Sequence, residues 1–148
     1  MDNQSDKMAR FDFLLGNWNM EYRVPKSPFS EMDQGLGIGT FKRILNNSYV
    51  QFDYSASLSR SQGAAHGIFA WDNKTGIYRY WWFENSGNFL TATCNFVNKN
   101  TLLFNWHDTL LIQTFSKKNP NKVILRMEYP TTKVKYDLAL EVIFIRKT

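Results

Sequence analysis

The chain has 148 residues, of which 43% are hydrophobic and 16% aromatic. A chain this apolar is not disordered, and its length is sufficient to bury one core without disulfides or metal. Its longest apolar runs fall well short of the roughly 18 residues that span a bilayer, and its first ten residues are polar. We therefore expect neither a membrane span nor a leader peptide. The single cysteine, Cys94, excludes an internal disulfide and predicts a reducing compartment, the cytoplasm.

The net charge of +5 is concentrated in the last third of the chain. Residues 99–148 carry nine basic and four acidic side chains, whereas residues 1–98 carry nine of each. The basic residues stand singly or in pairs, such as Lys117-Lys118, and no run reaches five. This pattern is typical of solvated turns and strand faces, so we expect no nucleic-acid partner.

The chain is predicted to begin with a helical turn over residues 7–15, with Asp6 as its cap and Gly16 as its stop. Its apolar side chains fall on one side at helical spacing: Met8, Phe11, Leu14 and Leu15.

After this turn, short β-prone runs alternate with turn residues. Strands are predicted at 17–24, 36–45, 48–58, 64–71, 77–84, 88–96, 101–107, 110–116, 122–129 and 135–146. The short links predict an antiparallel meander, and closing it removes both unpaired edges. A two-sheet sandwich, the alternative, usually needs longer crossovers. We therefore predict one all-β domain over residues 1–148, an antiparallel up-and-down β-barrel of about ten strands with a short N-terminal helical turn.

Gly16-Asn17-Trp18 opens the first predicted strand and resembles the Gly-x-Trp signature of lipocalins and their calycin relatives. In that superfamily the tryptophan closes one end of the barrel under a basic residue from the last strand. The resemblance therefore implies structural roles for Gly16 and Trp18, with Arg146 or Lys147 as the basic partner. A cation over an indole face contributes about 0.5–2 kcal/mol.

A second resemblance covers about residues 9–95. The sequences FDFLLGNW at 11–18 and GIFAWDNKTGIYRYWWF at 67–83 are similar to an uncharacterised, mainly bacterial family of lipocalin-like proteins. The turn Asn85-Ser86-Gly87 also resembles that family's next turn. The family carries no settled activity, so the resemblance implies a fold and leaves the function open.

Side-chain alternation predicts which residues face the barrel interior. If Trp18 points inward, then Met20 and Tyr22 do so too, and Arg146 shares the parity of the apolar row on the last strand. On the third strand, the apolar row contains Phe52 and Tyr54. On the seventh, alternation leaves open whether the row of Leu102, Phe104 and Trp106 or that of Leu103, Asn105 and His107 faces inward.

An interior rich in aromatic side chains with a few polar tips suits a small, flat, hydrophobic or amphipathic ligand. The predicted ligand-binding side chains are Tyr22, Phe52, Tyr54, His66, Tyr80, Trp82 and His107. The alternative is an enzyme that uses a barrel-lining histidine as its acid or base. His107 and Asp108 are adjacent, so they point to opposite faces of a strand and do not form a catalytic pair easily.

Cofactor sites find little support in the sequence. His66, Cys94 and His107 do not stand at metal-ligand spacing, so no metal site is predicted. Nitrobindin-type haem barrels, a less favoured alternative, place a histidine late in the chain, and this sequence has none after His107. We therefore expect no cofactor. The motif Gly35-Leu36-Gly37-Ile38-Gly39 precedes a strand, so it indicates sheet curvature rather than a phosphate loop.

The strand at 77–84 is aromatic on both faces. Tyr78, Tyr80 and Trp82 alternate with Ile77, Trp81 and Phe83. A barrel strand exposed to water should alternate apolar and polar residues, and on the outer face of this one only Arg79 is charged. The outer face therefore predicts a cover by a helix, a loop or another subunit, and a homodimer would provide it.

Overall fold

The computed structural model describes residues 4–28, 30–107 and 109–148. The helices are α1 Gln4–Met8 and the 3-10 helix η1 Ala9–Leu14. The strands are β1 Gly16–Val24, β2 Asp33–Ile44, β3 Tyr49–Leu58, β4 Gln62–Asp72, β5 Ile77–Glu84, β6 Phe89–Asn98, β7 Thr101–Asn105, β8 Ile112–Asn119, β9 Lys122–Pro130 and β10 Tyr136–Arg146.

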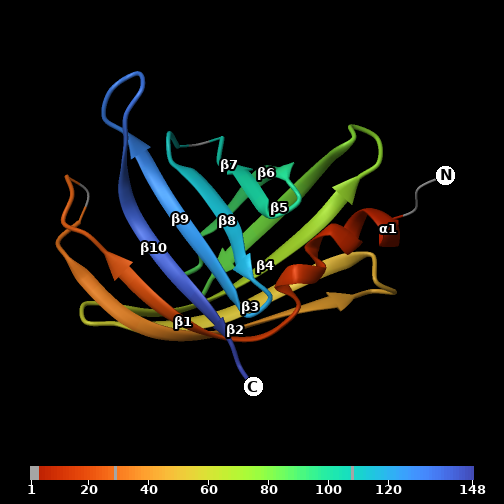
Figure 1. The fold of residues 1–148 in the computed structure, drawn as a ribbon, viewed down its shortest axis with the longest axis horizontal. Coiled ribbons are helices and arrows are strands. Elements are labelled where there is room, and N and C mark those ends of the chain that lie inside the picture. Colours follow the sequence, from red (N-terminus) through yellow and green to blue (C-terminus); the bar gives the residue numbers. More distant parts are fainter. Residues whose placement is uncertain (1–3, 29, 108) are drawn as a thin grey trace.

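The ten strands form a closed antiparallel barrel in which each strand pairs with its neighbours in sequence and β1 pairs with β10 (Figure 1). The predicted fold class is confirmed, and the strand boundaries differ from the predicted ones by at most three residues. Turn residues set these boundaries because glycine and asparagine adopt the positive φ angles that reverse the chain. Asn46, Asn47 and Gly76 lie in such turns with φ values of 61°, 63° and 68°.

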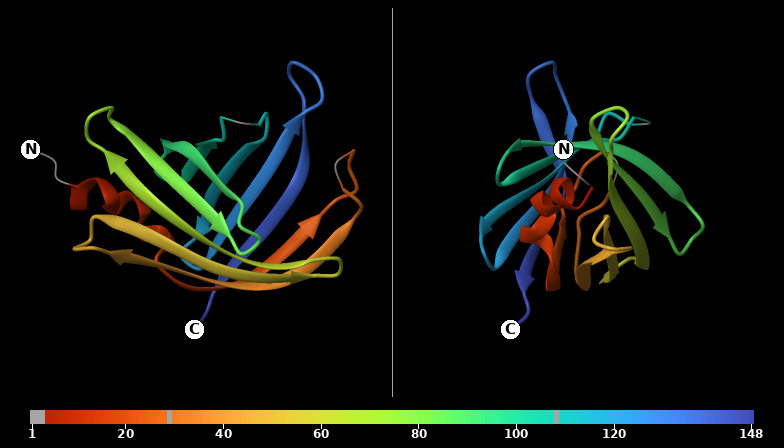
Figure 2. Two further views of the ribbon diagram at one scale, coloured as in Figure 1. Left: turned by 180° about the vertical axis from the view of Figure 1, so that it is seen from behind. Right: turned by 90° about the vertical axis from the view of Figure 1, so that its right-hand side faces the viewer.

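The N-terminal helices lie at one end of the barrel, which we call the helix end (Figure 2). Met8, Phe11 and Leu14 are fully buried there, as their spacing predicts. Asp6 lies within α1 rather than capping it, because the helix already includes Gln4. The Tyr78 hydroxyl donates a 2.7 Å hydrogen bond to the Lys7 carbonyl and so ties the helix to β5.

Trp18 is fully buried at the start of β1, and its indole N–H donates to the Leu14 carbonyl at 2.7 Å. The Arg146 guanidinium lies 4.2 Å from the centre of the Trp18 ring. It also donates to the carbonyls of Phe13, at 3.2 Å, and Leu15. Gly16 leaves room for it, since a Cβ there would lie 2.6 Å from Arg146 Nη1.

The glycines of the 35–39 motif lie in β2, which no helix follows. A Cβ on Gly37 would lie 3.0 Å from the Tyr22 ring, and one on Gly39 would lie 2.9 Å from both Met20 and Phe52. The bare inner face of β2 therefore accommodates large side chains from β1 and β3.

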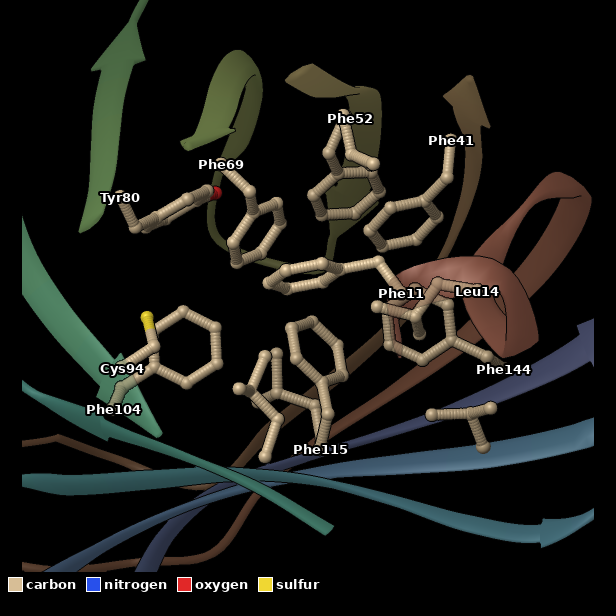
Figure 3. Close-up of a cluster of buried hydrophobic side chains, with 14 of the residues drawn as sticks. Phe11, Leu14, Phe41, Phe52, Phe69, Tyr80, Cys94, Phe104, Phe115 and Phe144 are labelled. Atoms are coloured by element: carbon tan, nitrogen blue, oxygen red, sulfur yellow. The ribbon is translucent and has the colours of Figure 1, made fainter. Parts of the chain in front are cut away.

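Phenylalanine rings fill the interior next to the helix end (Figure 3). Phe41 and Phe52 stack with ring centres 3.9 Å apart, and Phe11 of η1 packs 4.8 Å from Phe69. Burial of each such side chain stabilises the fold by about 1.5–3 kcal/mol. Farther from the helix end, the rings no longer fill the barrel.

Candidate ligand-binding cavity

A cavity of about 280 Å³ occupies the barrel interior beyond this core. Phe52, Phe115 and Phe144 belong both to the core and to the cavity wall, so the packed rings form its floor. The remaining described lining residues are Met20, Tyr22, Tyr54, Tyr80, Trp82, Leu90, Trp106, Thr109, Leu111, Gln113, Leu125, Met127, Leu140 and Val142. None of the lining residues that the structure describes carries a formal charge.

The structure brings the five aromatic candidates together at this cavity. Tyr22 comes from β1, Phe52 and Tyr54 from β3, and Tyr80 and Trp82 from β5. Alternation along each strand places them on the inner face. Tyr80 packs against Gly67 of β4, where an added Cβ would lie 2.1 Å from its hydroxyl oxygen.

His66 lies on the outer face of β4, because its neighbour Gly67 occupies the inward position. Its Nδ1 lies 2.5 Å from Asp53 Oδ1, and Gln51 Nε2 donates to Asp53 Oδ2 at 2.5 Å. Partial burial works to raise the pKa of Asp53, but the hydrogen bonds from His66 and Gln51 lower it below its ordinary value. The Asp53 carboxylate thus holds the imidazole outside the barrel.

His107 is exposed just after β7, with its Nε2 3.2 Å from the Thr93 hydroxyl on the outer face. The inward row is that of Leu102, Phe104 and Trp106, all buried, which resolves the parity that the sequence left open. Asp108 lies outside the described residues.

The structure therefore brings neither histidine to the cavity. Among the described lining residues there is no imidazole to act as acid, base or axial haem ligand. In the described part of the chain, no group of three or more His, Cys, Asp or Glu side chains could hold a metal ion. Burial raises the pKa of the Cys94 thiol above its ordinary value.

Two tryptophans donate hydrogen bonds to polar side chains of the cavity wall. The Trp82 indole N–H donates to the Tyr54 hydroxyl oxygen at 2.8 Å, and the Trp106 indole N–H donates to Gln113 Oε1 at 3.0 Å. Sequence reasoning missed Trp106 and Gln113 as site residues. The available signal was that Gln113 and Phe115, two residues apart, share one face of the strand. A glutamine is usually expected to face solvent, however, so this signal is easily overlooked.

The tyrosine hydroxyls of the cavity are neutral at physiological pH. Burial, with repulsion from Tyr54, raises the pKa of Tyr22, and burial also raises the pKa of Tyr54. Burial raises the pKa of Tyr80 most clearly, and Tyr54, Cys94 and Tyr22 add repulsion. These phenols therefore offer hydrogen bonds without charge.

The fold and cavity define a class of protein: closed, antiparallel ten-stranded barrels with a largely apolar interior pocket. Within it, the chain belongs to the family described as Protein of unknown function (DUF1579), whose model matches residues 4–107. No curated protein matches the sequence. In the part of the chain that the structure describes, no helix is long and apolar enough to cross a membrane.

Three solved structures show a similar fold. Rv2717c from M. tuberculosis aligns with a TM-score of 0.65 at 10% identity, covering 95% of this chain and 97% of that one. The S-type phycobiliprotein lyase CPES from Guillardia theta aligns with a TM-score of 0.57 at 9% identity, covering 98% and 96%. A de novo designed fluorescence-activating β-barrel aligns with a TM-score of 0.51 at 12% identity, covering 92% and 95%.

Proposed function

We propose that the protein binds a small, flat, largely apolar ligand with one or two polar groups inside the barrel. The cavity carries this proposal, since its walls are mainly aromatic and aliphatic and its polar atoms are few. Its volume of about 280 Å³ is close to twice the ~150 Å³ of an engineered cavity that takes benzene. A ligand of one or two rings therefore suits it.

We place the chain among calycin-type barrels as a single domain, supported by the Arg146 guanidinium over the buried Trp18 ring. The buried free thiol of Cys94 supports a cytoplasmic location. The similar folds of a phycobiliprotein lyase and a fluorescence-activating design are in keeping with a ligand-binding barrel.

Binding of 2-naphthol tests the proposal, because this compound is flat, bicyclic and amphipathic. Isothermal titration calorimetry should show one site per chain. Leu140→Trp places a large ring in the cavity and should abolish binding. Leu36→Trp, on the exposed outer face of β2, is the matched control and should bind as the unmodified protein does. Absence of binding, or equal binding by both variants, would overturn the proposal.

A further inference from the structure

Two hydrogen bonds in the cavity wall orient the polar groups of Tyr54 and Gln113. An indole N–H can only donate a hydrogen bond, whereas a hydroxyl and a primary amide can both donate and accept. Trp82 donates to the Tyr54 oxygen, so the Tyr54 O–H must point elsewhere. Trp106 donates to Gln113 Oε1, which fixes the amide so that Nε2 points away from that indole. The two tryptophans therefore leave a donor free on each partner.

The free donors are available to a ligand. Among the described residues, neither Gln113 Nε2 nor the Tyr54 O–H donates to another protein group. In the described chain, Arg43 Nε is the only fully buried side-chain nitrogen or oxygen without a hydrogen-bond partner. The unpaired Gln113 Nε2 is therefore not fully buried. The Gln113 amide nitrogen is thus open to the cavity, although the residue as a whole is only 7% exposed. A bound ligand that covers this donor without accepting its hydrogen bond loses about 1–3 kcal/mol.

The two donors stand on opposite walls. Tyr54 belongs to β3 and Gln113 to β8, and these strands are five places apart in either direction around the ring of ten. A ligand that satisfies both must therefore carry acceptors at two opposite ends. It must also be neutral, since no charged side chain among the described lining residues would compensate a charge of either sign on the ligand.

We propose that the cavity selects a neutral, flat compound with a carbonyl-type hydrogen-bond acceptor at each end, and that Trp82 and Trp106 favour it by donating to the oxygens of Tyr54 and Gln113, which turns the O–H and NH₂ donors away from the indoles and toward the ligand. This inference rests on the proposed function and names the ligand class of the same site. The raised pKa values of the cavity tyrosines agree with it, because these phenols keep their protons.

Three compounds of the same size separate acceptor recognition from apolar binding. 1,4-Diacetylbenzene has an acceptor at each end, 4-isopropylacetophenone has one, and 1,4-diisopropylbenzene has none. In calorimetric titrations, each carbonyl should tighten binding by about three- to tenfold, the worth of one neutral hydrogen bond. Indole, which is a donor, should bind more weakly than 1,4-diacetylbenzene. Equal affinities across the three benzenes, or tighter binding of indole, would overturn the inference.

Two variants test the tryptophans through the selectivity rather than the affinity. Trp106→Phe frees Gln113 to turn its amide oxygen to the ligand, and Trp82→Phe frees the Tyr54 hydroxyl to accept. In both variants the preference for 1,4-diacetylbenzene over indole should fall by at least about threefold. Trp81→Phe, on the outer face of β5, is the matched control and should leave the preference unchanged. An unchanged preference in both cavity variants, with thermal melts showing that they are folded, would contradict the role of the indoles.

Failure of this inference is distinguishable from failure of the proposed function. If 2-naphthol binds and Leu140→Trp abolishes it, the cavity is a binding site whatever the order of the acceptor series. If 2-naphthol does not bind, or binds equally to Leu140→Trp and Leu36→Trp, the proposed function itself is wrong.

Discussion

At the scale of single residues, the contact between Trp18 and Arg146 joins the two ends of the chain. Register places Trp18 directly opposite Arg146 in the β1–β10 pair, so the guanidinium reaches the indole and the carbonyls at the C-terminal end of η1. One side chain therefore fastens the helix end and the strand pair that closes the barrel.

Trp18→Ala should lower the free energy of unfolding by about 3–5 kcal/mol, the usual cost of truncating a fully buried aromatic side chain. Arg146→Met should cost less, about 2 kcal/mol, since it removes a cation–π contact and charge-assisted hydrogen bonds near the surface. Urea denaturation followed by circular dichroism measures both. Arg146→Lys keeps the charge but loses the fork of donors, so it should fall between the unmodified protein and Arg146→Met. A larger loss for Arg146→Met than for Trp18→Ala would contradict this order.

At the scale of elements, the Asp72 carboxylate stabilises the turn of the β4–β5 hairpin. Asp72 Oδ1 accepts hydrogen bonds from the backbone N–H groups of Lys74, at 3.0 Å, and Thr75, at 3.3 Å. Its Oδ2 accepts from Arg79 Nε at 2.8 Å, and Gly76 completes the turn with a positive φ. The Arg79 and Thr75 side chains lower the pKa of Asp72 from 3.8 to about 2.

A carboxyl group whose pKa is lower in the folded state stabilises the fold above its unfolded pKa. This contribution should therefore be complete at pH 6 and should decline as the pH falls from about 4 to about 2. Asp72→Asn should lower the melting temperature at pH 6, and the difference from the unmodified protein should shrink over that acid range. Differential scanning calorimetry at several pH values measures it. Glu31→Gln, an exposed change outside the hairpin, serves as the control. A difference that stays constant down to pH 2 would show that the carboxylate charge is not the cause.

At the scale of the whole molecule, barrel closure pairs every strand on both sides but leaves apolar side chains on the outer face. Phe83 and Phe89 lie opposite each other on β5 and β6, with ring centres 6.4 Å apart, and are 46% and 69% exposed. Trp81 on the same face is half-buried. Self-association through this face stays a prediction from the sequence.

Trp81→Glu or Phe83→Glu should shift a homodimer to monomer, because each puts a charge into an apolar contact. Sedimentation velocity at 10–100 µM, roughly the range of a moderate dimer affinity, measures the change. Val97→Glu, at an exposed apolar position near the opposite end of β6 from Phe89, is a matched control for added charge. If the unmodified protein sediments as a monomer across this range, the predicted dimer is wrong.

The sequence by itself determined the number and order of the strands, the closed barrel and the apolar rows on the first, third and last strands. These follow from local properties: turn residues end strands, and alternation with a period of two assigns each side chain to a face. The aromatic candidates Tyr22, Phe52, Tyr54, Tyr80 and Trp82 were found in this way, and they meet at the cavity.

Only the tertiary structure decided the rest. Alternation defines two faces of a strand but does not say which one is inside, so His66 and His107 were placed with the cavity although both lie outside it. The pairing of Trp106 with Gln113 depends on the register of β7 against β8. The cavity itself depends on how completely side chains from strands distant in sequence fill a common volume, and this is a property of packing in three dimensions that no local pattern records.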